Sequence, residues 1–102
     1  MEKIVCAALY YNDGIFREHQ SSNMKTGMVI CGLRHCNCFS TMMIIFPDRE
    51  HIVNPDERIV QGFITTKNRF VDRTEGFLIA LKEGQIIHNP RDTEILMSED
   101  LY

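Results

Sequence analysis

Four short segments of the chain are rich in residues that favour β-strands, and turn-forming residues separate them. They are residues 2–11, 28–31, 59–66 and 69–71, and the run of β-branched residues in 59–66 makes that strand the clearest. Asn12-Asp13-Gly14 indicates a turn, after which residues 15–17 are predicted to return as the second arm of a hairpin. Residues 18–27 are polar and lack an apolar period, which predicts a mobile loop.

A first helix is predicted over residues 34–45. Cys36, Phe39, Met43 and Phe46 recur at steps of three and four, which is typical of one buried helical stripe. Pro47 disfavours helical backbone in the residue before it, so the helix should end there. A charged loop is expected over residues 48–58.

A second helix is predicted to begin at Asp72. An aspartate at the N-cap followed three residues later by Glu75 is typical of a helix start. Phe77, Ala80 and Leu81 would form its buried stripe, and Gly84 is a natural residue to follow its end. An extended stretch should follow over residues 85–89 and stop at Pro90, and the apolar residues of the 95–102 tail should dock on the domain.

The order of strands, helix, strands and helix predicts an α+β fold: a small antiparallel sheet with two helices packed on it. The 102 residues suit a single domain over 1–102. Two helices cover only one face of such a sheet, so we expect a homo-oligomer in which a second copy covers more of it.

Composition narrows the function classes. Hydrophobic residues make up 44% of the chain, charged residues 25%, and the formal net charge is -3. No basic field attracts DNA or RNA, so we expect no nucleic acid polymer as partner. No apolar run is long enough to span a bilayer, and the start of the chain does not resemble a signal peptide, so we expect no membrane partner and a cytoplasmic location.

Four cysteines stand at positions 6, 31, 36 and 38. Without a secretion signal, reduced thiols are the better interpretation than disulfides. A zinc site with His35 is conceivable, but Cys36 and Cys38 would point to different faces of a helix and no Cys-x-x-Cys pair exists. We therefore expect no bound metal and no cofactor. A Cys–His nucleophile is also conceivable, but the chain carries no signature of such an enzyme.

Arg34 and His35, which follow Gly32 at the start of the first helix, are candidates for an anion site. A helix start offers unpaired N–H groups and the positive end of the helix dipole, and an arginine fork beside it can hold phosphate. The alternative is a solvated pair that merely begins the helix.

The segment 62–73 is a second candidate site, because it combines aromatic, basic and amide side chains around a strand–turn–helix junction. Stacking on an aromatic ring with polar hydrogen bonds is a common way to hold a purine. The candidate residues are Phe63, Asn68, Arg69, Phe70 and Asp72. The alternative is that both rings belong to the core and Asp72 only caps the helix.

The segments 33–39, 61–65, 68–75, 84–86 and 98–102 together resemble phage Thoeris anti-defence proteins of the first type, with Arg69-Phe70-Val71-Asp72-Arg73 as the sharpest match. The resemblance implies a homo-oligomeric sponge in an infected bacterial host, which binds a cyclic ADP-ribose isomer or related cyclic nucleotide signal without cleaving it. Residues 14–28 look longer than the usual link of that family, so any role they have there is open.

The resemblance and the two candidate sites together predict a sequestering protein rather than an enzyme. Arg34 and His35 would hold phosphate, Phe63 or Phe70 would stack on the base, and Asn68, Arg69 and Asp72 would complete the polar shell. The main alternative is a small hydrolase that acts on a nucleotide-like signal. A third is a protein-interaction module that binds no nucleotide.

Overall fold

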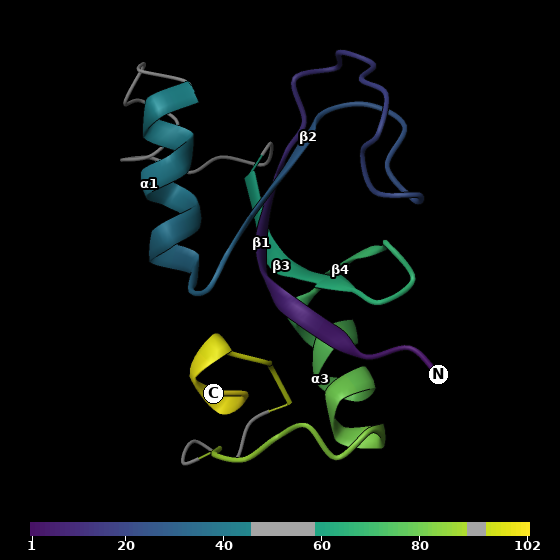
Figure 1. The fold of residues 1–102 in the computed structure, drawn as a ribbon, viewed down its shortest axis with the longest axis vertical. Helices are drawn as coiled ribbons and strands as arrows, with labels where there is room; N and C mark the ends of the chain where they lie inside the picture. The colour runs from purple at the N-terminus through teal and green to yellow at the C-terminus, as the bar shows by residue number, and fades with distance from the viewer. Residues whose placement is uncertain (46–58, 90–93) are drawn as a thin grey trace.

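The computed structural model describes residues 1–45, 59–89 and 94–102 (Figure 1). Its centre is a four-stranded antiparallel sheet in the order β2-β1-β3-β4. The strands are β1 (Ile4–Tyr11), β2 (Met28–Gly32), β3 (Ile59–Thr65) and β4 (Phe70–Asp72). The helices are α1 (His35–Ile45), α3 (Arg73–Lys82) and the short 3-10 helix η1 (Ser98–Asp100). The predicted α+β fold is confirmed. The loop predicted over residues 48–58, the last residue of the predicted α1 stripe (Phe46) and the proline predicted to end the 85–89 stretch (Pro90) lie outside the described residues.

The hairpin arm predicted at residues 15–17 is wrong. β1 pairs instead with β2, with Tyr11 opposite Met28, and residues 15–17 belong to no strand. Side chains hold this backbone locally: the Ile15 amide donates to Asp13 Oδ1 over 3.0 Å, and the Arg17 guanidinium binds both carboxylate oxygens of Asp13. Such local bonds compete with a strand ladder, and this explains the missing hairpin arm.

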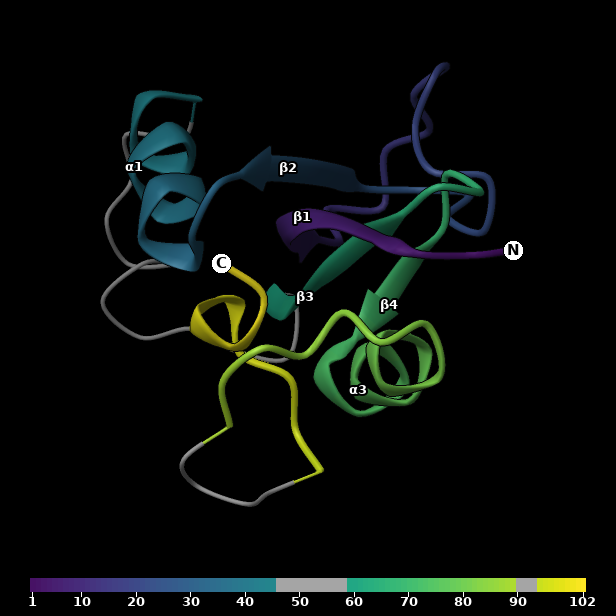
Figure 2. The ribbon, with the colours of Figure 1, turned by 60° about the horizontal axis from the view of Figure 1, so that its bottom comes forward.

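Both helices pack on the same face of the sheet. Phe63 of β3 is fully buried there; the His35 ring of α1 meets it edge-on with 5.1 Å between ring centroids. Gly76 of α3 approaches the same ring so closely that a Cβ would lie 3.2 Å from it. In Figure 2, α1 lies beside the end of β2 and α3 lies below β4, with η1 between the two helices. The core therefore lies in the layer between sheet and helices.

The buried stripe predicted for α1 is shifted by one residue. Its buried residues are His35, Cys38 and Met42, while Cys36 and Met43 are exposed and Phe39 is half-buried. Apolar residues occur on every side of this helix, so spacing alone does not fix its orientation. Contacts with the strands do: the Cys38 thiol lies 3.6 Å from the Ala7 carbonyl of β1, and Gly32 at the end of β2 packs closely on Cys38.

The predicted start of α3 is confirmed, since the Glu75 amide donates to Asp72 Oδ1 over 2.8 Å. Gly84 follows its end with a φ of 67°, a backbone conformation that suits glycine. Leu81, however, is 57% exposed, because the inner face of α3 is formed by Gly76, Phe77 and Ala80. The small Gly76 lets the helix approach the sheet on that side, which leaves Leu81 at the edge.

The predicted docking of the tail is confirmed for part of its residues. Leu96 is fully buried and Leu101 packs against the core, whereas Ile95 stays 47% exposed. Backbone bonds hold the tail, since the Leu96 amide donates to the Arg73 carbonyl over 3.0 Å. Residues 85–89 run beside it without forming a strand. Among the helices that the structure describes, none has the length and apolar character needed to cross a membrane.

Candidate functional site

A cavity of about 280 Å³ lies between the start of α1 and the tail that carries η1. The α1 residues are brought there because β2 ends at Gly32 and the chain turns directly into the helix. The tail reaches the cavity because Leu96 is anchored in the core. Its lining residues are Arg34, His35, Cys36, Arg73, Met97, Ser98 and Glu99. The cavity therefore joins one predicted anion site to residues far away in the sequence.

Arg34 is held by the tail but retains one buried nitrogen without a hydrogen bond. Its Nη2 donates to the backbone oxygen of Tyr102, and the Tyr102 ring lies over the guanidinium with 4.9 Å between the ring centroid and Cζ. Its Nη1 is buried and has no hydrogen-bond acceptor among residues 1–45, 59–89 and 94–102. The guanidinium is thus fixed in place, and one of its donors has no acceptor in the described part of the chain.

The start of α1 adds to the positive character of this cavity. The Arg34 carbonyl accepts the first helical bonds, from the amides of Asn37 and Cys38 at 3.0 and 3.2 Å. The Asn37 side chain in turn accepts the Arg34 amide at 3.0 Å. The first amides of a helix have no acceptor within it, and they carry the positive end of its dipole.

Arg73 brings a second guanidinium to the cavity while it ties the tail to the sheet. Its Nη1 donates to the Leu96 carbonyl at 2.9 Å and its Nη2 to Gln61 Oε1 at 2.7 Å. Glu99 is the acid among the lining residues. Two arginines and one glutamate give the lining a net positive charge, which suits an anionic ligand.

His35 connects α1 to the sheet, a role that the sequence did not predict. It is buried, and its Nε2 lies 2.8 Å from the Gly62 carbonyl. Its pKa is lowered, mainly by burial. A histidine that binds phosphate is expected to have a raised pKa instead. The ring is therefore a neutral donor to β3, and only its position at the cavity wall agrees with the predicted site.

Asn68 and Arg69 lie away from this cavity, in the turn between β3 and β4. Asn68 has a φ of 57° and its carbonyl accepts the Ser22 amide at 2.7 Å. Arg69 binds both carboxylate oxygens of Glu2 at 2.8 and 2.9 Å and Glu75 at 2.9 Å. The Arg69 guanidinium, with Thr65, lowers the pKa of Glu2 to about 2. This cluster joins the chain start to α3.

The aromatic and capping residues of segment 62–73 lie in structural positions. Phe63 is 0% exposed and Phe70 is 5% exposed. Neither ring presents an open face, so the stacking role predicted for them is not available in this structure. Asp72 caps α3 through its Oδ1. The structure therefore does not bring the seven predicted residues together: Arg34 and His35 lie at the cavity, and the other five do not line it.

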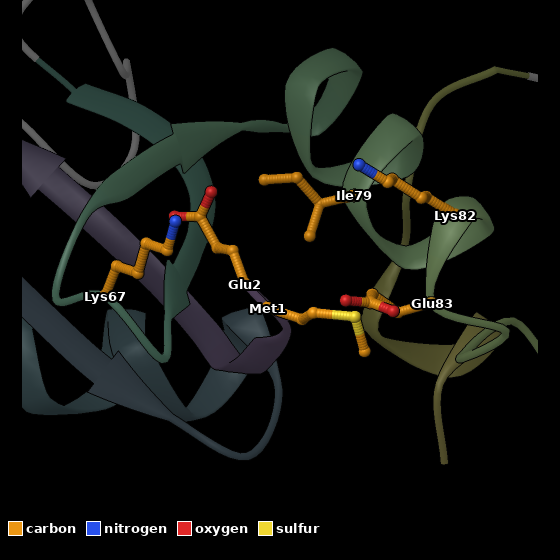
Figure 3. Close-up of a pocket in the computed structure, with 6 residues that line it drawn as sticks. All are labelled: Met1, Glu2, Lys67, Ile79, Lys82 and Glu83. Atoms are coloured by element: carbon orange, nitrogen blue, oxygen red, sulfur yellow. The ribbon is translucent and has the colours of Figure 1, made fainter.

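A second cavity, of about 230 Å³, opens between the chain start and α3. Figure 3 shows Lys67 and Glu2 on one side of it and Ile79, Lys82 and Glu83 on the other, with Met1 between them. Its two lysines are balanced by two glutamates, and Glu2 already binds Arg69. The cavity at Arg34 is therefore the stronger candidate for an anion.

Arg73, Cys36, Ser98 and Glu99 were not among the predicted site residues. Helical spacing predicts that Cys36 belongs to the buried stripe and not to a site. Arg73 is the last residue of the segment 62–73, in which the aromatic rings and the residues around the turn were the predicted binding groups. Residues 98–102 form part of the family resemblance, which was the one signal for the tail.

The cysteines do not form a metal cluster within the described part of the chain. No group of three His, Cys, Asp or Glu side chains there is arranged so that it could hold a metal ion. Cys36 is exposed and Cys38 is buried, so these two point apart as their spacing predicts. The absence of a bound metal itself stays a prediction.

Comparison with known proteins places the chain in a phage family. The family model described as phage T4 y16D protein matches residues 3–102, nearly the whole chain. No curated protein and no solved structure matched it. The match supports the phage origin that the sequence resemblance implies and carries no information on anti-defence activity. The chain belongs to the phage T4 y16D protein family.

Proposed function

We propose that this phage protein binds the phosphate of a small nucleotide in the cavity at Arg34 and retains the molecule without cleaving it. The observation that carries the proposal is Arg34 Nη1, a buried charged donor with no acceptor among the described residues. A buried polar group left without a partner costs about 1–3 kcal/mol, and more for a charged group. A phosphate oxygen at this position would remove that cost.

The neighbours of Arg34 support an anion rather than a neutral ligand. Arg73 adds positive charge to the lining, and the start of α1 adds the positive end of a helix dipole. Ser98 lines the cavity too, and its hydroxyl, which now donates to Glu99 Oε2 over 3.5 Å, would have to turn to donate to a phosphate oxygen. A guanidinium holds phosphate through two parallel bonds, so Arg34 also favours one orientation of the ligand.

The cavity suits the phosphate end of a nucleotide better than a whole nucleotide. Drug-sized ligands usually occupy about 300–1,000 Å³, and this cavity measures about 280 Å³. The base would then extend toward Tyr102, a residue that is 39% exposed and whose ring has the Arg34 guanidinium over one face. Tyr102 replaces Phe63 and Phe70 as the candidate stacking residue in this proposal.

The resemblance to Thoeris anti-defence proteins specifies the ligand as a cyclic ADP-ribose isomer or a related cyclic nucleotide signal. Such a molecule combines phosphates with an adenine, which matches an arginine cavity next to an aromatic ring. Binding would remove the signal by mass action and needs no catalysis. The function would be exerted in the cytoplasm of an infected host.

The surroundings of His35 support sequestration over the alternative of a hydrolase. A general base needs a nitrogen that can accept a proton from the reacting group. His35 Nε2 is bound to the Gly62 carbonyl and burial lowers the pKa of the ring. Cys36 is the thiol at the cavity, and His35 Nε2 is therefore not free to take its proton.

Release of ligand by heat tests this proposal. The purified protein is mixed with a cyclic ADP-ribose isomer, desalted, heated, and the released small molecules are measured by mass spectrometry. We expect the intact isomer in stoichiometric amount. Recovery of an opened or dephosphorylated product would support the hydrolase instead.

Binding of inorganic pyrophosphate and of ADP-ribose is measured in parallel by calorimetry. Pyrophosphate binding without binding of the cyclic isomer would leave the cavity assigned and the ligand wrong. Failure of all three ligands would contradict the proposal as a whole.

A further inference from the structure

The segment 12–27, which joins β1 to β2, is bonded to the far side of the sheet. In Figures 1 and 2 it lies beside the turn between β3 and β4. The Ser22 amide donates to the Asn68 carbonyl over 2.7 Å, and the Ser22 hydroxyl donates to the same oxygen over 3.0 Å. These bonds tie the segment to the β3–β4 turn, which the polar composition of residues 18–27 does not predict.

Asn23 occupies the place of a neighbouring strand at β4, which is an edge strand of the sheet. Its Nδ2 donates to the Phe70 carbonyl over 2.7 Å, and the Phe70 amide donates to Asn23 Oδ1 over 2.9 Å. Opposed residues of two antiparallel strands exchange the same pair of bonds through their backbones. One side-chain amide thus pairs both backbone groups that Phe70 would offer to a fifth strand.

The same segment covers the sheet face that lies away from the helices. Phe70 is opposite Ile64, and side chains alternate along a strand, so Phe70 points away from the helix face that Phe63 occupies. Phe70 is nevertheless only 5% exposed. The Tyr10 ring lies beside it, with 5.7 Å between ring centroids, and the Tyr10 hydroxyl donates to the Thr26 carbonyl over 2.8 Å. The segment therefore holds an aromatic cover on this face.

The segment is also bonded to β2, the strand at the opposite edge of the sheet. The Val29 amide donates to Gln20 Oε1 over 2.8 Å. Residues 20–23, called the strap below, thus make bonds at both edges. An edge strand with unpaired N–H and C=O groups is a template for pairing with another chain, and proteins commonly cover such edges.

We propose that the strap closes the β4 edge, and that a second copy of this chain pairs with that edge through its own β4 when Asn23 no longer occupies it. β4 is 3 residues long and passes directly into α3 at Arg73, so a long partner strand would find no further strand backbone to pair with. A second β4 has the same length. Two such edges can pair antiparallel about a two-fold axis.

The proposal gives a role to residues within the 14–28 segment, whose role the family resemblance leaves open. It rests on the bonds of the strap and does not depend on the function proposed for the Arg34 cavity.

Hydrogen exchange at the Phe70 amide, measured by NMR at micromolar and at millimolar protein concentration, tests the proposal. In the unsubstituted protein this amide should be equally protected at both concentrations. In Asn23→Ala it should exchange at least about threefold faster at the low concentration, because its acceptor is lost. At the high concentration protection should return, together with a rise in the mass measured by light scattering.

Tyr10→Phe is the matched control, because it removes the bond to Thr26 from the same segment and leaves Asn23 in place. Its Phe70 amide should stay protected at both concentrations. Circular dichroism checks that each variant is folded, and Asn23→Ser replaces Asn23→Ala if the alanine variant is unfolded. Unchanged exchange at Phe70 without Asn23 would overturn the role of the strap, and faster exchange that high concentration does not slow would overturn pairing with a second copy.

Discussion

Single residues whose structure depends on close sequence neighbours were predicted well, and those whose partners lie far along the chain were not. Asp72 caps α3 and Gly84 follows its end, because both roles depend only on residues a few positions away. His35 was predicted to hold phosphate, yet its partner Gly62 lies 27 positions away. The prediction that Arg69 binds ligand has the same weakness, because its partner Glu2 lies near the start of the chain.

The cap of α3 gives a direct prediction at this scale. Replacing Asp72 with Ala removes the acceptor of the Glu75 amide and should lower the free energy of unfolding by about 1 kcal/mol. Asp72→Asn keeps an acceptor in place and serves as the matched control, with stability close to that of the unsubstituted protein. Urea denaturation measures both; an equal loss in the two variants would show that charge, not capping, matters here.

The pair of Glu2 and Arg69 predicts acid sensitivity. The pKa of Glu2 falls from its ordinary 4.5 to about 2 in the folded protein, chiefly through its hydrogen bond with Arg69. The unfolded chain therefore binds a proton first as pH falls, and the contribution of Glu2 to stability is complete above pH 4.5 and lost as pH falls from about 4.5 to about 2. Urea denaturation across this window should show a smaller pH dependence for Glu2→Gln than for the unsubstituted protein. Identical pH profiles would contradict the role given to this pair.

Elements were predicted where composition and spacing agree, and their orientation was not. The four strands and two helices were all expected, but the stripe of α1 was assigned one residue too far along. Seven of the residues 36–45 are apolar, so several stripes fit the helical period and only contacts with β1 and β2 select one. The hairpin arm at 15–17 failed because Asp13 and Arg17 bind each other locally.

The orientation of α1 can be tested with two neighbouring methionines. Met42 is 1% exposed and belongs to the core, whereas Met43 is 37% exposed. Met42→Ala should lower the free energy of unfolding by about 2–5 kcal/mol through the cavity it leaves. Met43→Ala should change it by less than about 1 kcal/mol. Thermal or urea denaturation measures both variants. A larger loss of stability for Met43→Ala than for Met42→Ala would contradict this orientation and support the buried stripe with Met43 that helical spacing predicts.

At the scale of the whole molecule, the candidate site depends on the way the tail returns to the start of α1. Arg34 was found from its position after Gly32, but Arg73 and Ser98 join it only through packing of α3 and the tail. No spacing pattern links three segments so far apart. Arg34, at the start of α1, could therefore be predicted from the sequence. Arg73 and Ser98 could be assigned to the site only once the fold was known.

The expected homo-oligomer belongs to this scale as well. The outer face of α1 carries Met43, Ile44 and Ile45, which are 37%, 83% and 44% exposed. An apolar strip of this kind favours association, so light scattering at micromolar concentration should give a mass of at least two chains. Ile44→Asp should lower that mass, while Leu78→Asp on the outer side of α3 serves as the control. A monomeric mass for the unsubstituted protein would contradict the expectation.

The central claim is that Arg34 holds the phosphate of a nucleotide signal, and calorimetry with a cyclic ADP-ribose isomer tests it most directly. Arg34→Ala should weaken binding at least about tenfold, because a charge-assisted hydrogen bond contributes about 1.5–3 kcal/mol. Arg34→Lys should not restore it, since lysine lacks the planar fork. Arg17→Ala, which alters an arginine paired with Asp13 in the 12–27 loop, should bind as the unsubstituted protein does. Unchanged affinity in both Arg34 variants, with normal circular dichroism, would contradict the account.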